Sequence, residues 1–200
     1  MLLIGLTGPS GAGKSTVSIL LSSFGLPILD ADVIYHRLLT PPSDCLNEIA
    51  AHFGREILLP DGTLDRRALG KLVFEDDAER EHLNRIAHSY ILQEVRKQVR
   101  QLRAMETPAA VFDAPQLFES GADKECSLVI SVLADADIRL HRILQRDGIS
   151  EEDAMRRMQA QKSDFFFRSH SDYVIENDGS PEYLLRQVKT ILRETGVITE

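Results

Sequence analysis

One glycine-rich segment near the amino terminus constrains the fold of this 200-residue chain more than any other part of the sequence. Residues 8–15 read GPSGAGKS and fit the pattern G-x-x-x-x-G-K-[ST], and the apolar run Leu2–Ile4 precedes them. This pattern predicts a loop between a buried strand and a helix, in which backbone N–H groups surround a β-phosphate. Lys14 then reaches the β- and γ-phosphate oxygens, and the Ser15 hydroxyl is placed to bind Mg²⁺. The residues of this predicted nucleoside triphosphate site are Ser10, Gly11, Ala12, Gly13, Lys14, Ser15 and Thr16.

Short apolar runs along the chain predict the strands of a parallel sheet. They lie at Leu2–Thr7, Pro27–Asp30, Ala109–Phe112, Ser127–Leu133 and Tyr173–Ile175. Helical periodicity at Asp137–Gln145 and Pro181–Thr195 alternates with these strands, as in a doubly wound sheet. The expected fold class is therefore α/β, with a P-loop NTPase-type three-layer arrangement around a parallel five-stranded sheet.

A long helical stretch interrupts this alternation. From Ala31 to about Met105 the pattern is helical throughout, with breaks near Pro41-Pro42 and at Pro60-Asp61-Gly62. Since this is too long for a simple crossover helix, we expect a helical insertion at 32–104 beside the sheet of a single domain, 1–200.

Composition narrows the possible partners. The net charge of −8 argues against a broad basic surface for nucleic acid, and no apolar run approaches the roughly 18 residues of a membrane helix. Without the basic segment of a secretory signal, the amino terminus favours a cytoplasmic location. Cys45 and Cys126 lack the spacing of a metal site and are expected to be reduced thiols that pack in the interior. We expect a monomer.

Carboxylates follow two of the predicted strands. Asp113 comes directly after Ala109–Phe112 and is expected to bind Mg²⁺ directly or through water, with a helix or turn cap as the alternative. Asp30 and Asp32 follow the second strand, where a carboxylate can accept the proton of an acceptor hydroxyl. Asp32 can instead cap the helix that begins at Val33. The residues alone leave both interpretations open.

Basic residues are concentrated in one short stretch. This stretch contains seven of the 23 Lys and Arg residues of the chain: Arg139, Arg142, Arg146, Arg156, Arg157, Lys162 and Arg168. The first three are three and four residues apart and share a helical face that can meet phosphates. We expect residues 139–168 to form a small helical lid that closes over phosphates and excludes water. A solvated helical face is the alternative.

The loop alone does not decide the reaction, because GTPases, motor ATPases and small-molecule kinases share it. The N-K-x-D motif with which GTPases recognise their base does not occur in this sequence. A helical acceptor pocket together with an arginine-rich lid favours a small-molecule kinase. Another nucleoside or nucleotide kinase, and an ATP-binding switch without catalysis, are the alternatives at this point.

Several further segments, taken in order, resemble the dephospho-coenzyme A kinase family over nearly the whole chain. They are LDAD at 29–32, DGTLDRRAL at 61–69, NRIAH at 84–88, DAPQLFESG at 113–121, RILQRDG at 142–148, RMQAQ at 157–161 and SDYVIENDG at 171–179. Two residues depart from the family pattern, Ser89 where Pro usually follows the histidine, and Gln116 where the family has Leu. The resemblance implies transfer of the ATP γ-phosphate to the 3′-hydroxyl of dephospho-coenzyme A, the last step of coenzyme A biosynthesis, with Mg²⁺ as cofactor.

The resemblance also implies roles for individual residues. Asp32 becomes the proposed base, in a catalytic set with Lys14, Arg142 and Arg146. Arg142 also belongs to the ATP-binding set, together with Asn177 and Gly179 in a turn that contacts adenine. Mg²⁺ is expected to bind at Ser15 and Asp113. The resemblance also implies that the helical insertion at 32–104 binds the coenzyme and that residues 139–168 form the lid. The implied substrate-binding residues are Asp32, Arg66, His88, Pro115, Leu117, Glu119, Arg157 and Gln161.

Overall fold

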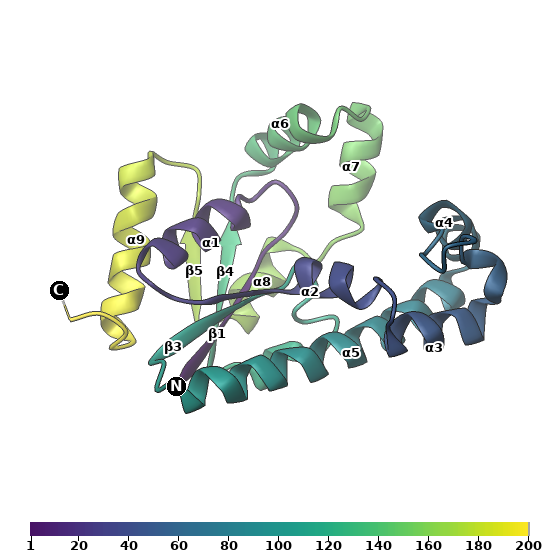
Figure 1. The fold of residues 1–200 in the computed structure, drawn as a ribbon. Coiled ribbons are helices and arrows are strands. Elements are labelled where there is room, and N and C mark those ends of the chain that lie inside the picture. Colours follow the sequence, from purple (N-terminus) through teal and green to yellow (C-terminus); the bar gives the residue numbers. More distant parts are fainter. Residues whose placement is uncertain (200) are drawn as a thin grey trace. The chain divides into compact units, whose positions relative to one another are not determined.

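The computed structural model describes residues 1–199, apart from the side chain of residue 75, and its contacts divide the chain into two compact units (Figure 1). The first, which we call the sheet unit, combines Met1–Leu29 with the chain from Leu102 onward. The second, the helical unit, is Asp30–Gln101. The two units are described separately below.

All five predicted strands form, and they make one sheet. They are β1 (Leu2–Thr7), β2 (Ile28–Asp30), β3 (Ala109–Asp113), β4 (Leu128–Leu133) and β5 (Tyr173–Glu176), in the order β2-β3-β1-β4-β5. The strand pairs β1–β3, β1–β4 and β4–β5 are parallel. The predicted ends differ from the observed ones by one residue at four of the strand termini, and Pro27 lies just outside β2, where its carbonyl accepts a hydrogen bond from the Val111 N–H at 2.9 Å. The expected α/β fold class is confirmed.

Helices α1 (Lys14–Ser23) and α9 (Pro181–Glu194) cover one face of the sheet. Their apolar side chains, such as Val17 and Val188, pack with Ile4 and Leu6 of β1 in the main core. Alternate residues of β1 point to the opposite face, where the segment 114–126 and α8 (Asp164–His170) pack. Gly5 lies on that face, and a Cβ there would come within 2.8 Å of Leu117, so the close packing requires glycine.

The segment expected as a lid, 139–168, contains most of α6 (Ala136–Asp147), all of α7 (Glu151–Gln159) and the start of α8, and α8 contacts β4 and β5. Helix α6 ends at Gly148, which adopts a left-handed conformation with φ 61° and reverses the chain. Helix α7 begins after Ser150, whose hydroxyl accepts a hydrogen bond from the Asp153 N–H at 3.1 Å. The turn brings the last residues of α6 within reach of α7 side chains.

The helical unit contains α2 (Ala31–Leu38), α3 (Asp44–Phe53), α4 (Arg66–Glu75) and most of α5 (Asp77–Ala104). Its own core includes Ile49, Phe53 and Ile86. The predicted break at Pro60-Asp61-Gly62 lies between α3 and α4, but the non-helical stretch is longer than predicted: a short 3₁₀ turn (Arg55–Ile57) precedes an antiparallel bridge between Leu58 and Leu64. The turn at residues 60–62 lets these two leucines pair across it, which periodicity alone does not reveal.

Both cysteines are free thiols. Burial raises the pKa of Cys45 to about 11 and that of Cys126 to about 12, so neither thiol is activated. Among the described helices, none combines the length and apolar character needed to cross a membrane.

Candidate functional site

The glycine-rich loop connects β1 to α1 and takes a shape that only glycine permits at several points. Gly11 and Gly13 have φ of 80° and 90°. A Cβ on Gly8 would come within 2.3 Å of the Val132 carbonyl oxygen of β4. Gly13 is the N-cap of α1 and offers no side chain to cap the helix. The first N–H groups of α1 are therefore available to an anion, at the end of the helix where its dipole favours negative charge.

Lys14 and Asp113 meet beside this loop. Asp113 is the last residue of β3, pairs in register with Leu6 of β1, and is buried. The Lys14 ammonium forms an ion pair with the Asp113 carboxylate. Asp113 therefore lies next to the phosphate loop. Ser15 and Thr16 are exposed in the first turn of α1.

Three arginines of α6 contact the same loop. Arg139 donates from Nε to the Ser10 carbonyl at 3.1 Å, and Arg142 donates to the carbonyls of Gly11 and Ala12 at 3.2 and 3.4 Å. Arg146 reaches the Ser10 hydroxyl at 3.4 Å. A purely solvated face is therefore wrong for this row. The guanidinium groups hold the loop carbonyls and so fix the shape of the loop. Two of the loop N–H groups are themselves bonded, Ser10 to Gln161 and Ala12 to the Pro9 carbonyl.

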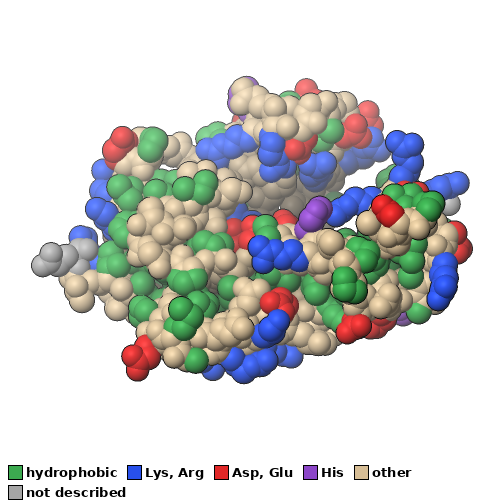
Figure 2. Space-filling view, in the orientation of Figure 1, with side chains coloured by type: hydrophobic (Ala, Val, Ile, Leu, Met, Phe, Trp, Pro, Cys, Tyr) green, Lys and Arg blue, Asp and Glu red, His purple; other side chains and the backbone are tan. Residues whose placement is uncertain are grey.

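The three arginines differ in burial. The side chain of Arg139 is only 7% exposed and also pairs with Asp164 at the start of α8, at 3.1 Å. Burial lowers the pKa of Arg139, and the Asp164 carboxylate opposes that shift. Arg146 is 60% exposed. Figure 2 shows basic and acidic side chains together over α6 and α7, and these two helices hold five Arg against five Asp and Glu residues.

Two more predicted residues come to the loop from distant parts of the sequence. Asn177 follows β5, is buried, and donates from Nδ2 to the Ala12 carbonyl at 2.8 Å. Its own carbonyl accepts from Arg142 at 2.9 Å. Gln161, expected among the substrate-binding residues, accepts a hydrogen bond from the Ser10 N–H at 3.0 Å and therefore lies at the nucleotide loop. Gly179 lies beside Tyr183, the nearest atom of which would be 3.0 Å from an added Cβ.

Sequence reasoning missed three residues of this arrangement. Arg139 was placed in the arginine row that can meet phosphates but was left out of the site residues, Asp147 was only part of the RILQRDG segment, and Asp164 was not singled out. Asp147 accepts hydrogen bonds from Arg146 and, across the turn, from Arg157. The signal for Asp147 was its place directly after Arg146, whereas no local pattern marks Asp164.

The segment after β3 holds three residues expected to bind substrate. The Pro115 carbonyl accepts a hydrogen bond from the Thr7 hydroxyl at 3.2 Å, and Glu119 is exposed. Leu117 is fully buried against Gly5 and Cys126. Its expected contact with substrate is therefore corrected to a packing role, because the side chain offers no surface to a ligand.

In the helical unit, the structure shows which of the two aspartates at the start of α2 caps the helix. Asp30 is the N-cap, and its carboxylate accepts from the Val33 N–H at 2.9 Å. Asp32 lies in the first turn of the helix. The alternative in which Asp32 caps this helix is therefore wrong, and its carboxylate is not committed to the cap.

Arg66 and His88, the other expected coenzyme residues of this unit, lie on different helices. Arg66 is the first residue of α4 and contacts His36 of α2, with 2.8 Å between its Nη2 and the His36 Nδ1. His36 is one helical turn after Asp32 and shares its face. The structure thus brings Arg66 to the Asp32 face of α2. His88 is half-buried on α5.

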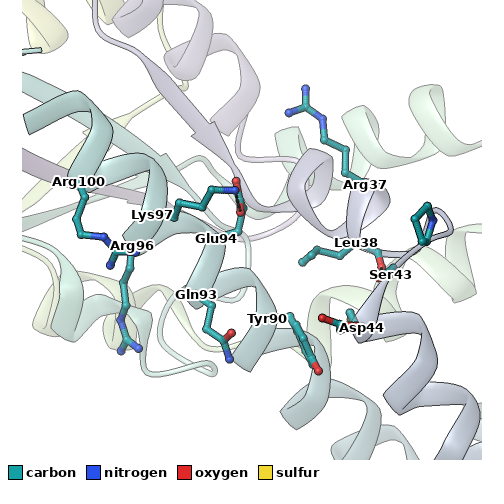
Figure 3. A pocket seen from close by; sticks show the side chains of 12 residues that line it. Arg37, Leu38, Ser43, Asp44, Tyr90, Gln93, Glu94, Arg96, Lys97 and Arg100 are labelled. Carbon is teal, nitrogen blue, oxygen red and sulfur yellow. Dashed lines mark hydrogen bonds and ion pairs between the residues drawn. The ribbon is translucent and has the colours of Figure 1, made fainter. Parts of the chain in front are cut away.

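A groove of about 670 Å³ also lies within the helical unit (Figure 3). Its lining includes Arg37 of α2 and Tyr90, Lys97 and Arg100 of α5. These α5 residues are roughly 120–200° around the helix from His88, and Arg37 is roughly 140° from Asp32, at 100° per residue. The groove was not foreseen, and these four lining residues lie on other helix faces than His88 and Asp32 do.

Comparisons with known proteins agree with this geometry. The sequence profile of the family described as dephospho-CoA kinase matches residues 2–182. The chain is 40% identical to a dephospho-CoA kinase of Symbiobacterium thermophilum over 96% of this chain and 81% of the relative. It is 39% identical to a dephospho-CoA kinase of Arabidopsis thaliana over 97% of this chain and 84% of that protein.

Comparison with solved structures also finds a dephospho-CoA kinase with a similar fold. A crystal structure of a Thermus thermophilus protein superimposes with a TM-score of 0.81 and 34% identity, covering 96% of this chain and 97% of that one. A dephospho-CoA kinase from Campylobacter jejuni gives 0.72 and 27%, covering 98% of both chains. A shikimate kinase from Acinetobacter baumannii, 18% identical with a TM-score of 0.55, shares the fold over 98% of this chain and 94% of its own.

Proposed function

The chain belongs to the dephospho-CoA kinase family, a family of enzymes for the final step of coenzyme A biosynthesis, and from this premise we propose how its residues carry the reaction. The glycine-rich loop and Lys14 bind the phosphates of ATP. The observation that supports this best is the meeting of Lys14 with Asp113 beside a loop whose carbonyls are held by Arg139 and Arg142. A loop held in this way presents donors to the phosphates before ATP arrives, which lowers the cost of orienting them.

Mg²⁺ is proposed to bind at Ser15 and Asp113. Ser15 offers an exposed hydroxyl in the first turn of α1, and Asp113 offers a carboxylate at the end of β3. Both are hard oxygen donors, which Mg²⁺ binds together with phosphate oxygens and water, so the two residues fit this metal. No cluster of three or more His, Cys, Asp or Glu side chains suited to a metal was found among the described residues. When bound, Mg²⁺ neutralises charge on the phosphate oxygens.

Asp32 is proposed to act on the acceptor. Its carboxylate accepts the proton of the 3′-hydroxyl as that oxygen bonds to the γ-phosphorus, and the bond to the bridging oxygen of ADP breaks. The capping role of Asp30 supports this assignment, because it leaves Asp32 without that structural duty. Arg146 is proposed to stabilise charge on the transferred group.

The remaining assignments are also proposals. Arg66, His88, Pro115, Glu119 and Arg157 are the candidates for contact with dephospho-CoA, and Asn177 and Gly179 for contact with adenine. A cytoplasmic location and a monomeric state are predictions from the sequence.

The test is phosphoryl transfer across a small panel of acceptors. With Mg-ATP, dephospho-CoA should be phosphorylated far faster than adenosine or AMP, and ATP should turn over slowly when no acceptor is present. Comparable rates with AMP would rule out the proposed acceptor, and rapid ATP hydrolysis without any acceptor would point to an ATPase.

A further inference from the structure

Asp147, the last residue of α6, receives hydrogen bonds from two arginines. The Arg146 guanidinium donates from Nε to Oδ1 at 2.7 Å and from Nη2 to Oδ2 at 2.9 Å. Arg157, one helix further along, donates from Nη1 to Oδ2. The contact between Arg146 and Asp147 is bidentate, with two N–H groups donating to the two carboxylate oxygens, which fixes the orientation of the guanidinium group.

This carboxylate fixes two side chains that otherwise have much freedom. The side chains of Arg146 and Arg157 are 60% and 44% exposed, and a long exposed arginine that must take one geometry loses rotamer entropy. Asp147 is 21% exposed. Asp147 therefore orders both arginines before a ligand binds, so that less rotamer entropy is lost when the ligand binds.

The arrangement also points Arg146 at the nucleotide loop. The same Nη2 atom that bonds Asp147 lies 3.4 Å from the Ser10 hydroxyl. Two guanidinium groups share one carboxylate, so a net positive charge stays on the cluster. The contact depends on Gly148, whose left-handed turn starts the reversal from α6 to α7.

We propose that Asp147 is a positioning residue for phosphoryl transfer, which holds the guanidinium groups of Arg146 and Arg157 in the orientation in which they engage the phosphates. The inference rests on the proposed kinase function. The competing explanation is a purely structural link between α6 and α7. The Arg146 and Arg157 hydrogen bonds hold the pKa of Asp147 at about 2, so the carboxylate is ionised throughout the neutral range.

The experiment compares Asp147→Asn with Asp147→Glu in steady-state kinetics with Mg-ATP and dephospho-CoA. Loss of the charge should lower kcat about 10-fold or more, a typical effect of removing a residue that orients another, while Tm changes little. The Glu variant retains a carboxylate and should recover activity to within about threefold of wild type. Asp153→Asn is the matched control, because Asp153 forms an exposed pair with Arg156 in the same lid but does not contact Arg146.

A double-mutant cycle completes the test. Arg146→Ala combined with Asp147→Asn should be scarcely slower than Arg146→Ala alone, because the aspartate acts through that arginine. Additive losses, a drop in Tm that parallels the loss of kcat, or an Asp147→Asn variant with wild-type kcat would each overturn the proposal. A wild-type enzyme that does not phosphorylate dephospho-CoA would instead overturn the proposed function.

Discussion

The sheet unit and the helical unit hold their candidate residues by different means. Around the phosphate loop, contacts join residues that are far apart in sequence, such as Lys14 with Asp113 and Asn177 with Ala12. In the helical unit, Asp30 caps α2 by accepting from the Val33 N–H three residues away, and Arg66 meets His36, 30 residues away. The comparison teaches that the phosphate loop is held by contacts across 99 and 165 residues of sequence, whereas the contacts at the start of α2 and α4 span 3 and 30 residues.

The largest expected effect tests the helical unit. Asp32→Asn should reduce kcat roughly 10²- to 10⁴-fold, because the amide cannot accept the hydroxyl proton as a carboxylate does. Tm and ATP affinity should be nearly unchanged, since Asp30 and not Asp32 caps the helix and the loop around Lys14 is untouched. Steady-state kinetics and a thermal melt give both quantities.

Asp30→Ala is the matched control for this prediction. It removes the hydrogen bond to the Val33 N–H and should cost about 1 kcal/mol of unfolding free energy, with a smaller loss of kcat than Asp32→Asn. An Asp32→Asn enzyme that keeps more than about a third of the wild-type kcat would exclude Asp32 as the base.

The next largest loss of kcat is expected for two arginines of the sheet unit, which should differ in their effect on Tm. Arg142→Ala and Arg146→Ala should each lower kcat about 10²-fold or more, because each removes a preorganised charge near the phosphates. Only Arg142→Ala should also lower Tm and weaken nucleotide binding, since it removes the arginine donor from the carbonyls of Gly11 and Asn177 and leaves the Ala12 carbonyl with Asn177 alone.

Thermal melts and titration with a fluorescent ATP analogue distinguish the two variants. Equal losses of Tm would mean that the loop does not depend on the carbonyl contacts of Arg142. Near wild-type turnover in either variant would remove that residue from the site.

The smallest effect concerns Arg66. Arg66→Ala should raise the KM for dephospho-CoA about 10-fold with kcat and Tm nearly unchanged, because a charged hydrogen bond contributes roughly 1.5–3 kcal/mol. Arg37→Ala is the control, since Arg37 lines the groove and not the Asp32 face of α2. If Arg37→Ala raised the KM and Arg66→Ala did not, the groove would be the site of the acceptor.

Local patterns in the sequence were enough to predict the secondary structure that positions the nucleotide loop. The strands β1, β3, β4 and β5 were located within one residue at each end, because each is a short apolar run that ends at a polar residue or turn. The spacing of Arg139, Arg142 and Arg146 put them on one helical face, and all three contact the loop. These features depend on neighbours a few positions apart, which a single sequence displays.

Only the tertiary structure decided which atoms these side chains hold. It assigned the cap of α2 to Asp30 and not to Asp32, turned Leu117 into the interior, and joined Asp147 to Arg157 across a reversed chain. It also brought Gln161 to Ser10 and Asp164 to Arg139. The sequence by itself determined a phosphate-binding α/β protein with the residues of a small-molecule kinase. The partners of those residues were settled by packing, because contacts between distant segments depend on the relative placement of whole strands and helices and not on the local pattern of either one.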